Sequence, residues 1–172
     1  MPSVILSIFI SQILWAAQGL TKGEGRYRAA PSAGATYPLE IFVVCGKNSI
    51  AEVAAGIYHY NIARHSLSLH YKGDIRLELA RAALGEEAIY HAPVAIIICA
   101  EYERTVVRYG PRAQRYVHME VGHAGQNIYL QATALGLATV AVGAFNDERV
   151  REVLRLEKQY KPLYIMPVGQ LA

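Results

Sequence analysis

The longest regular pattern of apolar positions lies in residues 117–135. Apolar side chains recur there every three or four positions, which is the spacing of one face of an α-helix. The neighbouring face is polar or small, so we expect a weakly amphipathic helix that is buried nearly all round. Gly136 suits the left-handed position that ends a helix, and a strand is predicted over residues 137–142. In residues 142–145, small side chains would let a flat ligand approach the backbone. A cofactor site and a plain core helix–strand unit explain this stretch equally well.

The same patterns predict the other elements. A helix is expected over residues 4–18 and should end at Gly19, and a short helix is expected over residues 49–55. Two more are expected over residues 75–84, capped by Asp74, and from a capping Asn146 or Asp147 to residue 156. Strands are expected over residues 40–46, 93–100 and 162–168, with a hairpin over residues 56–71 that turns at residues 61–65. The whole chain, 1–172, is therefore predicted to be one α+β domain with a mixed central sheet of four to five strands flanked by helices.

Composition adds an expectation about assembly. Hydrophobic residues make up 53% of the chain and charged residues 18%, with a mean hydropathy of +0.17. So few charges do not easily cover the surface of a small protein, which favours an obligate homodimer with an apolar interface. The formal charge is +3, but the basic residues form no run, so nucleic-acid binding is not expected. The positive charge would suit an anionic cofactor or substrate.

Several other functional classes are not expected. Cys45 and Cys99 lie in apolar runs without the spacing of a disulfide framework or a metal site, which favours a reducing, cytoplasmic setting. The apolar run at residues 4–14 is too short to span a membrane, and no basic residue precedes it as in a signal peptide. The histidines offer no pair at metal-ligand spacing beside an acidic residue, and no nucleotide-binding glycine loop or nucleophile motif is present.

Six segments of the chain, taken in order, resemble a known family. They are ILWAAQGL, RAAPSAGATYPLEIFVV, GIYHYN…HSL, RYGPRAQRYVHMEVGHAGQNIYLQATALGL, AVGAFND and PLYIMPVG. Together they are similar to the FMN-dependent nitroreductase superfamily, and most similar to its SagB-type, azoline-dehydrogenase-like branch. The resemblance implies an FMN-dependent oxidoreductase that transfers hydride at flavin N5 to or from a small or peptide-derived substrate. It also implies an intertwined homodimer with flavin sites at the subunit interface, and NAD(P)H as a candidate electron donor.

The resemblance also implies which residues hold the flavin. Those that match the family's cofactor-binding positions are Pro31, Ser32, Ala33 and Gly34 beside the isoalloxazine ring, Val142, Gly143 and Ala144 against its opposite part, Gln126 with Asn127 on the central helix, and Arg28 for the phosphate or ribityl chain. Backbone amides of the second loop would stabilise negative charge on the reduced ring. The alternatives are that Gln126 and Asn127 satisfy buried backbone groups and that Arg28 is a solvated loop charge.

The sequence departs from the family pattern in three places: the phosphate anchors, the first loop and the candidate catalytic motif. The usual Arg-Arg-Ser-type motif and the C-terminal basic residue, both phosphate anchors, are not found in the sequence, and Arg26, Arg28, Arg112 and Arg115 are the candidate substitutes. Ala35 stands where many relatives have an asparagine that contacts the flavin. Weak FMN affinity is therefore an expectation, and a non-catalytic dimer that binds a flavin or another planar ligand is the alternative function. A structural dimer without a ligand is a third.

The third departure concerns the candidate catalytic pair. The Lys-Tyr-Gly motif of the azoline-dehydrogenase branch reads Arg108-Tyr109-Gly110 here. Tyr109 could act as a general acid or base, whereas Arg108 stays protonated and could only orient an anionic substrate. The alternative is that the pair belongs to a surface turn.

Overall fold

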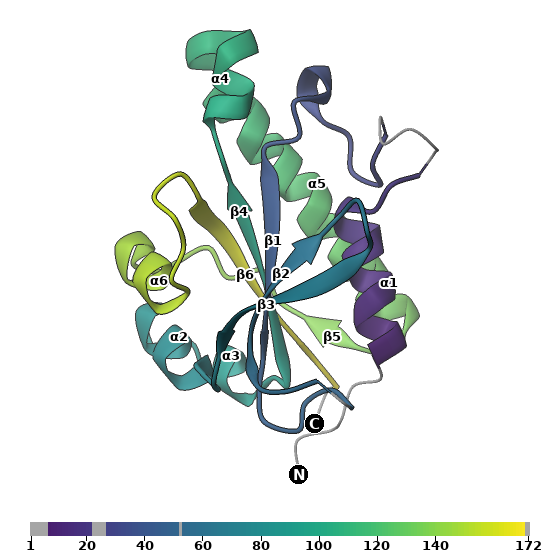
Figure 1. Ribbon diagram of the computed structural model, residues 1–172, viewed down its shortest axis with the longest axis vertical. Helices are drawn as coiled ribbons and strands as arrows, with labels where there is room; N and C mark the ends of the chain where they lie inside the picture. The colour runs from purple at the N-terminus through teal and green to yellow at the C-terminus, as the bar shows by residue number, and fades with distance from the viewer. Residues whose placement is uncertain (1–6, 22–26, 52, 171–172) are drawn as a thin grey trace.

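The computed structural model describes residues 7–21, 27–51 and 53–170. Its centre is a six-stranded sheet with the order β3-β2-β1-β4-β6-β5 (Figure 1). The strands are β1 (Leu39–Cys45), β2 (Gly56–Asn61), β3 (Ser66–Lys72), β4 (Val94–Ala100), β5 (Ala138–Thr139) and β6 (Lys161–Gly169). Residues 4–6 of the first predicted helix and Arg26 lie outside the described residues.

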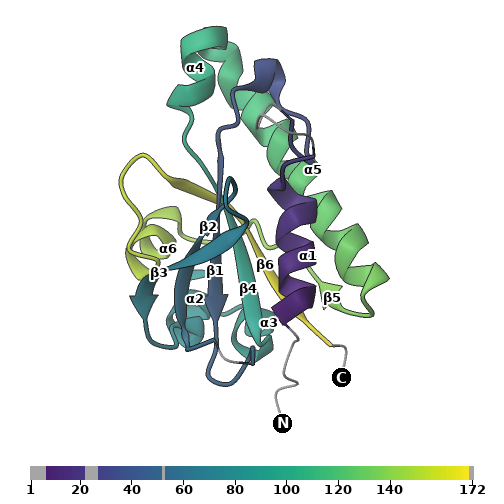
Figure 2. The same cartoon turned by 45° about the vertical axis from the view of Figure 1, so that its right-hand side comes forward.

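Helices cover both faces of this sheet (Figures 1 and 2). One face is covered by α1 (Ser7–Gln18) and α5 (Ala113–Ala134), and the other by α2 (Arg76–Ala82), α3 (Glu87–His91) and α6 (Asp147–Val153). At one end of the molecule lie α4 (Glu103–Tyr109), η3 (Gly110–Arg112) and η2 (Ala33–Ala35). Among the described residues, no helix combines the length and hydropathy needed to cross a bilayer.

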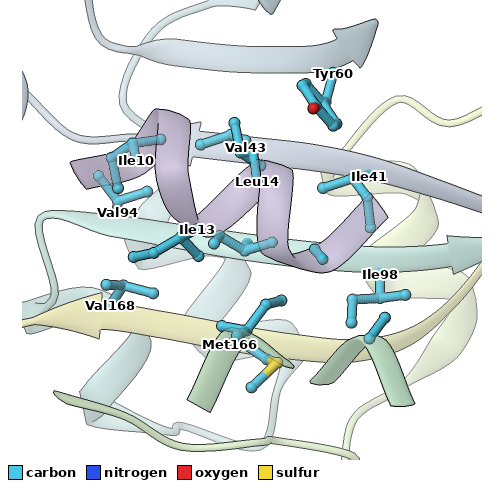
Figure 3. Close-up of a cluster of buried hydrophobic side chains, with 14 of the residues drawn as sticks. Ile10, Ile13, Leu14, Ile41, Val43, Tyr60, Val94, Ile98, Met166 and Val168 are labelled. Atoms are coloured by element: carbon cyan, nitrogen blue, oxygen red, sulfur yellow. The ribbon is translucent and has the colours of Figure 1, made fainter. Parts of the chain in front are cut away.

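Alternation along the central strands builds a core on each side of the sheet. In β1, Ile41 and Val43 pack toward α1 and α5, whereas Phe42 and Val44 pack toward α2 and α6. Figure 3 shows the first of these cores, in which α1 side chains meet those of β1, β4 and β6. All seven residues of β4 are buried, as its continuous apolar run predicted. A strand buried on both faces therefore forms the middle of the molecule.

The predicted α+β class is confirmed, but the details of the sheet are corrected. The sheet has six strands instead of four to five, and every strand pairing is antiparallel, so the expectation of a mixed sheet was wrong. Hydrophobic patterning sets which face of a strand is buried, but it carries no information on strand direction. The hairpin of β2 and β3 is confirmed.

Two predicted elements are wrong or shortened. Residues 49–51 and 53–55 form no helix, because Ile50 and Val53 make an antiparallel bridge and the Ser49 hydroxyl donates to the Gly46 carbonyl. Glu52, within the same predicted helix, lies outside the described residues. The strand predicted over residues 137–142 shrinks to the two residues of β5, followed by a single bridge between Val142 and Ile165.

Other helix predictions fare better, with different ends. Asn146 caps α6 by accepting a hydrogen bond from the Arg149 amide at 2.9 Å, and the helix ends at Val153 instead of residue 156. The carboxylate of Asp74 accepts from the Arg76 amide, although Ile75 occupies the cap position of α2. Neither α3 nor α4 was predicted.

The expectation that the long helix is buried nearly all round is wrong for the single chain. One side of α5 packs on α1 and the sheet, but the opposite side is exposed. Two large apolar side chains lie on that side, with exposed fractions of 53% for Met119 and 61% for Leu130. The single chain therefore leaves an uncovered apolar surface along its longest helix.

Candidate functional site

The Pro31–Gly34 loop is a tight turn that leads into η2, at the end of the molecule that carries α4. Its backbone is held by the Ser32 hydroxyl, which accepts a hydrogen bond from the Tyr37 amide at 2.9 Å. Gly34 adopts φ +56°, in the left-handed region that favours glycine. A β-carbon at Gly34 would lie 2.5 Å from the Tyr109 hydroxyl, so the turn accommodates only glycine without a shift.

The structure brings the candidate catalytic pair to this loop. Arg108 Nη1 donates to the Gly34 carbonyl oxygen at 3.2 Å, and the Tyr109 hydroxyl lies beside the same glycine. The ring of Tyr109 packs edge-on against Tyr116, with 4.9 Å between the ring centres. Two segments that were singled out separately in the sequence are therefore neighbours in the fold, about 74 positions apart along the chain.

Arg28 lies on the inner side of the same loop. Its Nη1 donates to Gln18 Oε1 at 2.9 Å, and its guanidinium stacks over the Tyr37 ring at 4.2 Å. Burial lowers the pKa of Arg28, opposed by the negative charges of Glu40 and Glu120. Its Nε is buried and has no hydrogen-bond partner among the described residues. Arg28 is thus a partly buried cation with one donor still unpaired.

Glu120 is a functional candidate that the sequence reasoning did not identify. It projects from α5 beneath the Pro31–Gly34 loop and is 2% exposed. Burial raises its pKa to about 7, although hydrogen bonding from the Ser32 hydroxyl and the charge of Arg28 favour its ionised form. One of its oxygens has no partner in the described part of the chain. The available signal was an acidic residue directly beside the apolar face defined by Val117, Val121 and Ala124.

Glu40, the other carboxylate near Arg28, is fully paired. It lies 2.7 Å from Arg104 and 2.6 Å from His59. Desolvation opposes its ionisation, but the hydrogen bonds from His59 and Arg104 outweigh it and lower the pKa of Glu40. Glu40 is therefore ionised near neutral pH and fixes the loop end of β1.

The second predicted loop lies elsewhere. Val142 exchanges two backbone hydrogen bonds with Ile165, at 2.9 and 3.0 Å, whereas Gly143 and Ala144 are exposed. Val142 and Ala144 line an open depression of about 480 Å³ together with the connection between α2 and α3, residues 83–87. The chain that follows the Val142 bridge therefore borders an accessible space.

The polar residues of α5 separate into two roles. Gln126 is exposed and lines a second depression, of about 460 Å³, with Tyr129, Leu130, Thr133 and Ala134. Asn127 instead donates to the backbone oxygen of Ala16 at 2.9 Å and to that of Ala29 at 3.4 Å. Asn127 thus ties α5 to α1, which matches the alternative considered for it.

Tyr129, which was not predicted, accepts from the Ala141 amide at 2.8 Å and holds the start of the second loop.

The two loops contact different parts of the single chain. Among the described residues, no hydrogen bond joins the Pro31–Gly34 loop to residues 142–144, and the depression beside Val142 and Ala144 includes no residue of that loop. The first loop contacts α4 and α5, whereas the second borders the side of the sheet that carries α2 and α6. No cluster of three potential metal ligands occurs in the described part either.

Comparison with known proteins places this arrangement in a family. The model of the nitroreductase family matches residues 9–170. The chain therefore belongs to the nitroreductase family, and with it to the flavin-dependent oxidoreductases.

Individual relatives agree with this assignment. MJ1384, a nitroreductase homologue of Methanocaldococcus jannaschii, is 51% identical over 94% of this chain and 79% of its own length. The trifolitoxin-processing protein TfxB of Rhizobium leguminosarum bv. trifolii is 34% identical over 78% of this chain and 37% of its own. A crystal structure of a nitroreductase homologue from Anabaena variabilis superposes with a TM-score of 0.85 at 31% identity, over 94% of this chain and 34% of the other. The chain thus spans about a third of the last two proteins.

The residues present fit a flavin in two halves. Pro31 and Gly34 are exposed in the first loop, and Gly143 and Ala144 are exposed in the second. Arg28 supplies a positive charge for an anionic group. Each loop therefore presents exposed backbone to a flat ligand.

Proposed function

We propose that the protein is an FMN-dependent oxidoreductase that acts as a homodimer. The observation that carries this proposal is the separation of the two flavin-type loops within one chain of the nitroreductase family. A second copy would supply the missing half of each site. The exposed apolar side of α5, with Met119 and Leu130, is the surface on which we place that second copy.

Each candidate residue has a distinct role in this proposal. The Pro31–Gly34 loop would lie along the ring, amides of residues 142–144 would face the part of the ring that gains charge, and Gln126 would border the pocket. Arg28 would bind the phosphate or the ribityl chain. A bound flavin supplies two-electron chemistry at N5. Tyr109, fixed beside Gly34, could exchange a proton with the substrate, and Arg108 could orient an anionic one.

The substrate class is proposed as a small molecule or a peptide-derived group, with NAD(P)H as the candidate electron donor. The name of TfxB describes a protein that processes trifolitoxin, which favours the peptide-derived alternative. Against it, Arg108 replaces the lysine expected of an azoline dehydrogenase, and a guanidinium is a poor base at neutral pH. A small-molecule substrate remains the first choice.

The protein is proposed to be a single domain, and its cellular setting is proposed to be the cytoplasm. Cys45 and Cys99 are both buried and free, and burial raises the pKa of Cys45 to about 12. They lie at opposite ends of the β1–β4 pair, since Cys45 faces Val94 and Cys99 faces Glu40. They therefore do not form a disulfide with each other, which supports the proposed reducing setting.

Flavin titration of the purified protein tests this proposal. We expect FMN to bind with a dissociation constant in the micromolar range or tighter, measured by quenching of flavin fluorescence, at one flavin per chain. Reduction of bound FMN by NADPH or NADH, followed by turnover of a quinone or nitroaromatic acceptor, would establish the oxidoreductase. Flavin binding without turnover of any donor–acceptor pair would support the alternative, a non-catalytic binding dimer. No binding at all would refute both.

A further inference from the structure

A buried polar cluster lies behind the Pro31–Gly34 loop, between α1 and α5. It consists of Gln18, Arg28, Ser32 and Glu120, and it is defined by the contacts already described. Three of the four buried side-chain polar atoms that lack a hydrogen-bond partner in the described residues belong to it: Gln18 Nε2, Arg28 Nε and Glu120 Oε1. Unpaired buried polar atoms are costly and rare, so their concentration at one place calls for a functional explanation.

The charges in this cluster are incompletely matched. Arg28 and Glu120 attract each other through space, but they form no ion pair within 4.0 Å in the described part of the chain. Arg28 also faces Tyr37, the paired carboxylate Glu40 and, repulsively, Arg104. Because Glu40 is already engaged by Arg104 and His59, Glu120 is the carboxylate whose charge state is open. Its protonation therefore changes the total negative charge that acts on Arg28, to which Glu40 also contributes.

Ser32 connects this charge to the loop. Its hydroxyl is hydrogen-bonded to Glu120 and also accepts from the Tyr37 amide. A carboxylate accepts the hydroxyl proton, whereas a neutral carboxyl group can itself donate. Ionisation of Glu120 thus changes both the restraint on Arg28 and the hydrogen bonding of the Pro31–Gly34 loop.

We propose that Glu120 is a positioning residue that competes with the anionic group of the cofactor for Arg28, so that FMN binds more tightly when Glu120 is protonated. The inference rests on the proposed function, because it assigns Arg28 to the flavin. When Glu120 is charged, its attraction through space adds to that of Glu40 and favours the inward position of the guanidinium beside Gln18. When it is neutral, the charge of Arg28 is available to the phosphate or ribityl chain. The raised pKa of about 7 places this change near neutral pH.

The test compares wild type with Glu120→Gln, which keeps the shape and removes the charge. FMN affinity is measured by fluorescence quenching between about pH 6 and pH 8.5. The fraction of protonated Glu120 falls tenfold per pH unit above its pKa, so wild type should lose up to about 30-fold in affinity over this range relative to E120Q. The phosphate of FMN itself ionises near pH 6, so the two proteins are compared at each pH. Glu78→Gln, an exposed change on α2, serves as the control and should follow wild type.

The outcomes separate this inference from the function on which it rests. Parallel pH profiles for wild type and E120Q, or weaker binding by E120Q at about pH 8, would overturn the role of Glu120 while FMN binding stands. Absence of FMN binding by wild type at every pH would overturn both.

A measurement without flavin adds an independent check. Since the pKa of Glu120 in the folded chain lies above its ordinary value of 4.5, the folded protein holds an extra proton between about pH 4.5 and 7. As pH rises from about 4.5 to 7, Glu120 should lower the stability of wild type, and this contribution should be absent in E120Q. Thermal unfolding of both proteins measures the difference. In the folded protein, the Arg28 Nε resonance should shift with a midpoint near pH 7 in wild type alone. The same shift in E120Q would refute the coupling.

Discussion

Gly34 is fixed in its loop by two constraints that act on different atoms. Its φ of +56° is unfavourable for residues with a β-carbon, and that carbon would meet the side chains of Tyr109 and Arg108. The sequence shows a glycine at this position, but it does not show that Tyr109 and Arg108 lie against it. A small-residue loop indicates an accessible backbone without revealing which side chain lies against it.

This difference can be measured by substitution with alanine. Gly34→Ala should lower the free energy of unfolding by about 2 kcal/mol, against about 1 kcal/mol for Gly136→Ala, where φ is +69° but no atom lies near. Urea denaturation gives both values. Removing the hydroxyl with Tyr109→Phe in the Gly34→Ala background should recover part of the difference. Equal costs at Gly34 and Gly136 would mean that Tyr109 moves aside freely.

At the scale of elements, the contact between α1 and α5 organises the loop face of the molecule. Asn127 joins the two helices and the start of the Pro31–Gly34 loop through the carbonyls of Ala16 and Ala29. The family resemblance singled out Asn127 on the central helix, but whether its amide met a ligand or the backbone depended on the packing partner. The hairpin of β2 and β3 required no such information, because its turn and alternation are local.

Asn127→Ala should therefore destabilise the protein by about 1–3 kcal/mol, since it leaves two backbone oxygens without this donor. A matched control lies one turn further along α5. Gln131 donates at 3.2 Å to the Gln12 side chain on the protein surface, and Gln131→Ala should change stability by less than about 0.5 kcal/mol. Thermal unfolding monitored by circular dichroism distinguishes the two. Similar effects at both positions would show that the Asn127 bonds contribute little.

For the whole molecule, the proposed dimer explains both the apolar composition and the divided site. The exposed apolar residues of α5 lie on the side away from α1 and the sheet, so a partner could reach them without any rearrangement of the core. Composition predicted such a surface without locating it. The fold places this surface on α5, because α1 and the sheet cover the opposite side of that helix.

Leu130→Glu should shift the protein from dimer to monomer in analytical ultracentrifugation, because a charge would be buried at the interface. It should also abolish FMN binding, because each proposed site needs the Pro31–Gly34 loop of one copy and residues 142–144 of the other. Leu69→Glu, at a similarly exposed apolar position on β3, should leave both properties unchanged. A monomeric Leu130→Glu protein that still binds FMN would show that one chain suffices for the site.

The sequence by itself determined the α+β class, most of the strands, the two small-residue loops and the family, since these depend on local periodicity and on ordered motifs. Only the tertiary structure decided the antiparallel direction of every strand pair, the meeting of Gly34 with Tyr109 and the separation of the two loops. It also revealed Glu120, whose pKa is raised because α5 carries it under the loop and away from water. Burial and pairing depend on residues distant along the chain, and a local pattern does not encode which distant residue will arrive.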